Sequence, residues 1–243
     1  MKVGAIIQAR MGSTRLPGKV MKEIKGKTVL SHVIERVKQS KLIDDIVIAT
    51  TVLDRDKAIE DEALKNGVKI YRGSEDDVLT RYFLAAKESN VDVIVRITSD
   101  CPLIDPHIID EIINFYINGS YDLVTNAGAD AYRTFPRGLD TEVFSYEALE
   151  TAFTNGSEMY HREHVTPYIY EHSNKIHYFK NDVDYSKYRW TLDTKEDFEL
   201  IQEVYNRLYK GKHDFYLGDI IECFEQEPKL FRINAHIEQK KMN

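Results

Sequence analysis

The sequence has few cysteines and no long apolar run. Cys101 and Cys223 are its two cysteines, and neither belongs to a CxxC pair. Two cysteines are too few for a disulfide framework, so we expect both to be reduced and structural. No uninterrupted apolar stretch approaches 18 residues, and the chain opens on a short run of strand length. These absences argue against a membrane-spanning helix and a secretory signal, and we expect a cytoplasmic protein.

The chain also lacks an excess of positive charge. Its formal net charge is −7, which argues against a general nucleic-acid binder. A hydrophobic content of 42% and a charged content of 30% over 243 residues are ordinary for a soluble globular protein. This length suffices for one α/β domain with a full core.

The first chemical signal is the stretch from Gly4 to Lys19, GAIIQARMGSTRLPGK. The apolar run 3–7 is typical of a strand buried on both faces of a parallel sheet, and a glycine-containing basic loop follows at its carboxyl end. Open α/β sheets bind ligands there. Glycine lets a backbone approach a phosphate closely, while arginine and lysine supply charge.

Local charge supports an anionic ligand for this loop. Residues 1–27 hold seven Lys or Arg residues against one Glu. The bland alternative is a solvated surface loop, but the strand before it and the helix after it favour a site for a polyanion. The glycine and lysine spacings match neither the GxxxxGK[ST] phosphate loop nor the GxGxxG dinucleotide motif.

Strand and helix patterns alternate along the chain, which predicts a mostly parallel sheet covered on both faces. Expected strands are 3–7, 46–51, 68–71, 92–98, 122–126, 138–144 and a short one ending at Asp193. Expected helices are 28–39, 56–66, 78–89, 107–118, 194–209 and a closing helix within 219–231.

A second signal follows the expected strand 92–98. Asp100 stands at the end of that strand, where a carboxylate can hold Mg²⁺ while water and phosphate oxygens supply the other ligands. A turn or capping role is the alternative for Asp100. Asp105 precedes Pro106, a favourable first helical residue, so we expect Asp105 to cap the next helix.

A third signal is the stretch 189–197, RWTLDTKED. Thr194 and Asp197 fit the capping box of a long helix. The box leaves Asp193 unexplained at a strand end, where it is either a second metal ligand or a turn cap. Trp190 is the chain's single tryptophan, and we expect it to pack in the core.

The segment 122–180 contains further candidates. Arg133 and Arg137 lie in a basic, aromatic loop, and arginine suits bidentate binding of a carboxylate, although a surface position is the alternative for both. His161 and His164 stand three apart in an expected helix. They lack further ligands in a recognisable arrangement, so we do not favour a metal site there.

Five separated blocks carry a family resemblance. They are QARMGSTRLPGKV, RGSEDDVL, TSDCPLIDP, FPRGLDTEVF with REHVTPYIY, and RWTLDTKEDFEL. The first resembles the GSxRxPxK signature of cytidylyltransferases that activate acidic sugars, the group of the acylneuraminate and 3-deoxy-manno-octulosonate enzymes. Within that group the chain most resembles the branch of spore coat polysaccharide biosynthesis proteins. It has QAR where many sialic-acid and octulosonate enzymes have PAR, which leaves the acceptor sugar open.

The resemblance implies a fold and an activity. The fold is a three-layer α/β/α, nucleotide-diphospho-sugar transferase-like (Rossmann-like) domain over residues 1–243, in which 127–181 form an excursion for sugar binding and dimerisation. The activity is transfer of CMP from CTP to an acidic sugar, with Mg²⁺ as cofactor and release of pyrophosphate, by a homodimer without nucleic-acid or membrane partners.

The resemblance also extends the set of site residues. They are Arg15 and Lys19 as catalytic residues; Arg10, Gly12, Ser13, Arg72 and Ser99 as nucleotide contacts; Asp100 and Asp193 as Mg²⁺ ligands; and Arg137 and Arg162 as substrate contacts. No general base is evident.

Two other functions stay open at this point. A nucleotide-sugar-dependent glycosyltransferase of similar architecture would use a DxD motif at a strand end. The motif Asp182-Val183-Asp184 is expected in a loop, which counts against this function. A non-catalytic subunit would bind the nucleotide without releasing pyrophosphate.

Overall fold

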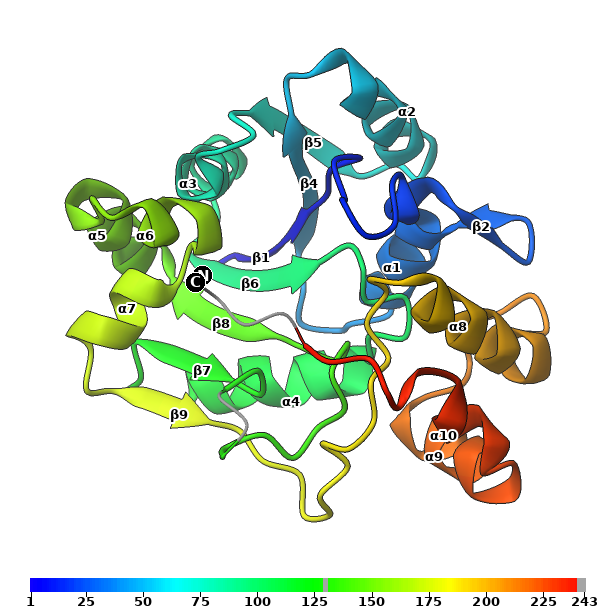
Figure 1. Ribbon diagram of the computed structural model, residues 1–243. Helices are drawn as coiled ribbons and strands as arrows, with labels where there is room; N and C mark the ends of the chain where they lie inside the picture. The colour runs from blue at the N-terminus through cyan, green and yellow to red at the C-terminus, as the bar shows by residue number, and fades with distance from the viewer. Residues whose placement is uncertain (129–130, 240–243) are drawn as a thin grey trace.

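The computed structural model describes residues 1–128 and 131–239 (Figure 1). One sheet contains seven strands in the order β5-β4-β1-β6-β8-β7-β9. Their bounds are β1 Val3–Gln8, β4 Asp45–Thr51, β5 Lys69–Gly73, β6 Val93–Thr98, β7 Leu123–Thr125, β8 Glu142–Ser145 and β9 Ile176–Tyr178. Strand β8 runs antiparallel to β6 and β7, and the other pairs are parallel. The expected mostly parallel sheet is confirmed.

Helices cover both faces of the sheet (Figure 1). One face packs on α1 (Val29–Val37), α2 (Lys57–Lys65), α4 (Pro106–Ile117), α8 (Lys195–Leu208), α9 (Leu217–Gln226) and α10 (Lys229–Asn234). The other packs on α3 (Val78–Ser89), α5 (Tyr146–Asn155) and α7 (Pro167–His172), with α6 (Met159–His164) against α3. Ala5 and Ile7 of β1 enter the first core and Ile6 enters the second, as the alternation of a strand requires. The three-layer α/β/α fold is therefore confirmed.

The strand order places a topological switch point beside β1. From β1 the chain passes through α1 to β4 and β5 on one side, then returns through α3 to β6 on the other side of β1. The loops after β1 and β6 therefore diverge at neighbouring strand ends. Such a point opens a crevice outside the carboxyl edge of the sheet. None of the helices within the described residues is long and apolar enough to cross a membrane.

Several local predictions are confirmed. The Oδ1 of Asp105 accepts the amide of His107 at 2.9 Å and so caps α4. Thr194 and Asp197 form the capping box of α8, and Trp190 is fully buried.

Two element predictions are wrong, and the strand expected over 138–144 begins only at Glu142. The strand expected to end at Asp193 is a single bridge between Arg189 and Arg137, because the chains touch for only one residue. The closing helix is two helices, α9 and α10. Pro228 lies between them, and proline lacks the amide hydrogen that would continue the α9 ladder.

Gly138 permits the close approach of these two chains. Its φ is +102°, and a Cβ there would lie 2.5 Å from the carbonyl carbon of Trp190. Gly211 also has a positive φ, +92°, but a Cβ would meet nothing within 4 Å. We expect Gly211→Ala to lower the free energy of unfolding by about 1 kcal/mol through backbone strain alone. Gly138→Ala should lower it by about 1–3 kcal/mol more, because backbone must also move. Urea denaturation measures both, and equal losses would contradict the close approach.

A buried histidine pair lies beneath the hairpin of β2 (Glu23–Ile24) and β3 (Lys27–Thr28). His32 Nε2 donates to the carbonyl of Ile24 at 2.8 Å, and its Nδ1 lies 2.8 Å from Nε2 of His213. Burial lowers the pKa of His32 to about 4 and the pKa of His213 to about 3. Arg36 and Lys27 add to this lowering at both rings, while Glu35 opposes it at His32.

This pair should make the protein sensitive to acid. Below the ordinary pKa of 6.5 the unfolded chain binds protons at both histidines and the folded chain does not. Their stability contribution is thus complete above about pH 6.5 and is lost as pH falls toward 4. We expect the free energy of unfolding to drop by about 3–6 kcal/mol over this range. His32→Gln should flatten the dependence, and a variant with the wild-type slope would refute this origin.

Candidate functional site

The loop after β1 is fixed at both ends. The amide of Met11 donates to Oδ1 of Asp56 at 2.7 Å, which ties the loop to the start of α2. Leu16 is buried in the core, and Gly18 adopts the left-handed conformation with φ +65° before the short helix Lys19–Met21. The loop therefore folds over the carboxyl edge of β1 and holds its basic side chains there.

Lys19 connects the two predicted metal ligands. Its Nζ lies 2.7 Å from Oδ2 of Asp100 and 2.9 Å from Oδ1 of Asp193. Asp100 follows β6, whereas Asp193 comes from the segment before α8. The side chains of Lys19 and Asp193 are 12% and 13% exposed and that of Asp100 is 22% exposed, so water reaches all three. Residues 174 positions apart in sequence thus meet at the switch point.

The charges at this point stabilise one another. Burial favours a lower pKa for Lys19, but attraction to Asp100 and Asp193 prevails and raises that pKa to about 12. Burial similarly favours a higher pKa for Asp100, yet the charge of Lys19 and hydrogen bonds from Lys19 and Thr98 lower it. Lys19 is therefore a cation and Asp100 an anion at neutral pH.

Two arginine side chains hold the carboxylate of Asp193 in place. Its Oδ2 accepts Nη2 of Arg189 at 2.8 Å and lies 3.0 Å from Nη2 of Arg15. Arg189 also donates to both carboxylate oxygens of Asp197, and Asn234 of α10 donates to Oδ1 of Asp197 at 2.8 Å. This chain of contacts fixes Asp193 against α8 and the carboxy-terminal helix.

A second basic group borders the loop. Arg55, after β4, and Arg10 both contact Oε1 of Glu75, with Arg10 Nη1 at 3.5 Å. A Cβ on Gly12 would lie 2.9 Å from that same oxygen, which is the far end of a flexible side chain, so the loop passes close to this ion pair. Arg10 and Arg55 are about half exposed. Both guanidinium groups therefore remain open to an anionic ligand.

The remaining predicted nucleotide contacts form hydrogen bonds within the protein. The hydroxyl of Ser13 accepts the amide of Leu16 at 3.3 Å inside the loop, and Ser99 is buried with its amide bonded to the carbonyl of Gln8. Arg72 donates to the carbonyls of Thr51 and Leu53 and to Glu60. It anchors the segment after β4 in this structure, and its contact with a nucleotide stays a prediction.

The predicted substrate contacts are also engaged. Arg162 donates to Asp77 at 2.6 Å, to the hydroxyl of Thr80 at 2.6 Å and to the carbonyl of Phe153 at 3.0 Å, and so joins α6 to α3 and α5. The guanidinium of Arg133 pairs with Asp140. Arg137 is half-buried, and its backbone bonds to Tyr188 and Trp190. Roles for Arg137 and Arg162 in substrate binding stay predictions.

Sequence analysis did not single out Arg55, Glu75 or Arg189. Arg55 follows a strand that ends at the same sheet edge as β1, which is a signal that the sequence contained. The role of Arg189 could not be seen, because it depends on a contact with Asp193 behind the site.

The two carboxylates fit a divalent cation. Both already direct one oxygen at a single positively charged atom, Nζ of Lys19. Among residues 1–128 and 131–239 no three His, Cys, Asp or Glu side chains form a metal site by themselves. Mg²⁺ does not need three, since it takes one or two carboxylates and completes its shell with water and phosphate oxygens. Asp100 and Asp193 are thus suitable ligands for Mg²⁺ beside a bound phosphate.

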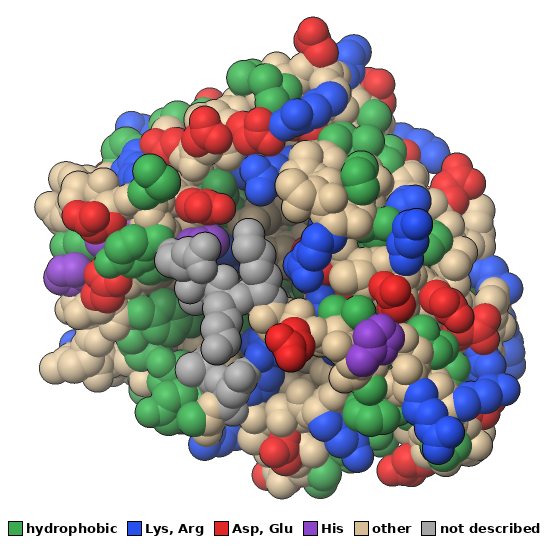
Figure 2. Space-filling model, viewed as in Figure 1, with side chains coloured by type: hydrophobic (Ala, Val, Ile, Leu, Met, Phe, Trp, Pro, Cys, Tyr) green, Lys and Arg blue, Asp and Glu red, His purple; other side chains and the backbone are tan. Residues whose placement is uncertain are grey.

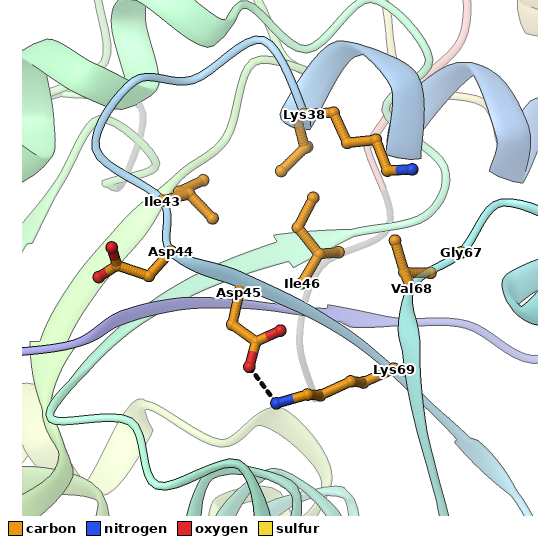
Figure 3. A pocket seen from close by; sticks show the side chains of 9 residues that line it. Lys38, Ile43, Asp44, Asp45, Ile46, Gly67, Val68 and Lys69 are labelled. Atoms are coloured by element: carbon orange, nitrogen blue, oxygen red, sulfur yellow. Dashed lines mark hydrogen bonds and ion pairs between the residues drawn. The ribbon is translucent and has the colours of Figure 1, made fainter.

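Acidic and basic side chains are interspersed over the face of the molecule that Figure 2 draws, and Lys and Arg side chains lie beside a hollow near its middle. A different hollow of about 490 Å³ lies between the end of α1 and the starts of β4 and β5, where Lys69 pairs with Asp45 (Figure 3). It is at the amino edge of these strands, opposite the basic loop.

Asp182 and Asp184 lie in an irregular segment between β9 and α8, not at a strand end.

Comparisons with known proteins identify the family of this chain. A family model described as cytidylyltransferase matches residues 4–232. The solved structure of a cytidylyltransferase from Leptospira borgpetersenii serovar Hardjo-bovis is 40% identical to this chain, covers 100% of both chains and has a TM-score of 0.88.

Two relatives add detail. The spore coat polysaccharide biosynthesis protein SpsF of Bacillus subtilis is 32% identical over 234 residues, which are 92% of this chain and 94% of its own. The 3-deoxy-manno-octulosonate cytidylyltransferase of Geobacter metallireducens is 37% identical over 113 residues, 46% of this chain and 44% of its own. Since the family model spans most of the sequence and the Leptospira structure shares the fold, this chain is a nucleotidyltransferase that belongs to the cytidylyltransferase family.

Proposed function

We propose that this cytidylyltransferase transfers CMP from CTP to a hydroxyl group of a sugar acid, with Mg²⁺ as cofactor and release of pyrophosphate, in polysaccharide biosynthesis. The observation that carries the proposal is Lys19 between Asp100 and Asp193 at the switch point, beside Arg15. The names of the Bacillus and Geobacter relatives support the pathway and the acid acceptor. A homodimer and a cytoplasmic location stay predictions.

The reaction needs charge and position more than covalent chemistry. The acceptor oxygen forms a bond to the α-phosphorus, the bond from that phosphorus to the bridging oxygen breaks, and the hydroxyl proton leaves to solvent. Lys19 and Arg15 face the place where a triphosphate would meet the acidic pair, so they would balance the charge of the departing pyrophosphate. Asp100 and Asp193 would hold Mg²⁺, which supplies positive charge at the α-phosphate and lowers the pKa of the attacking hydroxyl.

Other residues of the loop would orient the nucleotide. Gly12 would bring the backbone close to the ligand. Arg10 and Arg55 would offer a second cationic contact once their ion pairs with Glu75 break. On the acceptor side, arginine suits recognition of the sugar carboxylate, and Arg137 is the predicted residue.

An acceptor panel tests this function. The protein, CTP and Mg²⁺ are incubated with sugar acids and, as matched controls, with neutral sugars and sugar 1-phosphates, and pyrophosphate is measured. We expect release only with sugar acids. Arg137→Met should raise the KM for the acid about 10-fold or more, since a charged hydrogen bond contributes about 1.5–3 kcal/mol, and leave the KM for CTP unchanged. Release with sugar 1-phosphates but not with acids would contradict the proposed acceptor.

A further inference from the structure

The position between the two carboxylates is filled by the ammonium group of Lys19. Oδ2 of Asp100 accepts a hydrogen bond from Lys19, and Oδ1 of Asp100 accepts the hydroxyl of Thr98 at 2.5 Å. Oδ1 of Asp193 accepts a hydrogen bond from Lys19, and its Oδ2 contacts Arg15 and Arg189. All four carboxylate oxygens of the pair therefore have partners. A divalent cation arriving alone would have to displace one.

The net charge of the cluster also disfavours binding of a divalent cation that arrives alone. Lys19, Arg15 and Arg189 carry three positive charges at this point, while Asp100, Asp193 and Asp197 carry three negative ones. The cluster is neutral as it stands, so it attracts a free divalent ion only weakly. Two of the three cations, Lys19 and Arg15, belong to the loop predicted to bind phosphates.

A bound triphosphate would change both the partners of the carboxylate oxygens and the net charge of the cluster. Its negative charges compete with the carboxylates for the ammonium group of Lys19 and the guanidinium group of Arg15. When Lys19 turns toward phosphate, Oδ2 of Asp100 and Oδ1 of Asp193 lose their partner together and face one point. The site then gains two free oxygens and net negative charge.

We propose that Lys19 acts as a resident cation that keeps the Asp100–Asp193 pair closed to divalent metal until a nucleoside triphosphate draws it away, so that the metal binds only together with the nucleotide. This inference rests on the proposed function. By linkage, the same competition makes the metal strengthen nucleotide binding. It also keeps the isolated protein from holding a metal ion without substrate.

Metal binding without any nucleotide tests the inference. Mn²⁺ is titrated into the full-length protein, and free Mn²⁺ is measured by electron paramagnetic resonance. Lys19→Met should bind Mn²⁺ at least about 10-fold more tightly than wild type, because two carboxylate oxygens lose their cation. Lys19→Arg retains the charge and should show no gain. The double variant K19M/D100N should lose the gain, which assigns it to this site.

The outcomes separate the two proposals. Circular dichroism checks that each variant is folded. If Lys19→Met is unfolded, Lys19→Gln is used instead. Wild type and a folded Lys19→Met or Lys19→Gln variant binding Mn²⁺ equally would overturn the resident-cation role. A gain in Mn²⁺ affinity together with no binding of CTP by the wild type in the presence of Mg²⁺ would support that role and refute CTP as the nucleotide, because the metal titration contains no nucleotide.

Discussion

Lys19→Met should lower kcat/KM for CTP by about 10²- to 10³-fold. The expectation follows from the loss of one preorganised positive charge at the point where the leaving pyrophosphate gathers charge, and single groups of this kind contribute about 3–4 kcal/mol to transition-state stabilisation. Lys19 is mostly buried and touches both carboxylates, so no neighbouring lysine can take its place. Initial rates of pyrophosphate release at varied CTP measure the effect.

Lys22 offers a matched control three residues later. Its ammonium group lies 5.4 Å from the centre of the ring of Phe198 in α8. Lys22→Met removes the same charge from the same part of the chain and should leave kcat/KM unchanged. Equal losses in the two variants would show that the general positive charge of residues 1–27 matters, and that the specific position of Lys19 does not.

Arg189→Met should destabilise the fold by about 3–5 kcal/mol. Arg189 is 7% exposed and lies between Asp193 and Asp197, of which Asp197 is fully buried. Removing one partner of a buried ion pair leaves the other charge without compensation, which is why the loss is large. The free energy of unfolding from urea denaturation, monitored by circular dichroism, gives the value.

Arg207 provides the comparison, because it also lies between two carboxylates. Its guanidinium contacts Glu203 at 2.6 Å and Glu227 at 2.7 Å, but all three side chains are at least 24% exposed. Water solvates the carboxylates that remain, so Arg207→Met should destabilise the protein by less than about 1 kcal/mol. Similar losses for the two arginines would contradict the idea that Arg189 is a buried support for Asp193.

The parts of the fold that could be predicted from the sequence are those with local causes. The limits of α3 agree with the sequence prediction because Asp77 caps its start and its apolar side chains recur at helical spacing. Asp100 was placed at a strand end, because an apolar run before a polar residue is visible in any sequence.

What could not be predicted depends on contacts between distant segments. Arg162 pairs with Asp77, 85 residues earlier, so its guanidinium is engaged in the fold although its sequence block favoured a substrate contact. The contact of Arg189 with Asp193 is local, four residues along the chain, but it was missed because the segment was expected to be a strand and forms only a single bridge. The bridging position of Lys19 also lay outside sequence reasoning, since no pattern says which charge fills a site in the absence of its ligand.

The most direct test of the nucleotide site is a thermal melt of wild type and Asp100→Asn with CTP, UTP, GTP or ATP, each with Mg²⁺ or with EDTA. Ligand at about 100 times its dissociation constant adds about 2.7 kcal/mol, which for a chain of this size corresponds to a rise in Tm of about 5–10 °C. The account predicts this rise for CTP with Mg²⁺ in the wild type, a smaller rise in EDTA, and no effect of Mg²⁺ in Asp100→Asn. If none of the triphosphates raises Tm while a nucleotide sugar does, the proposed reaction is wrong.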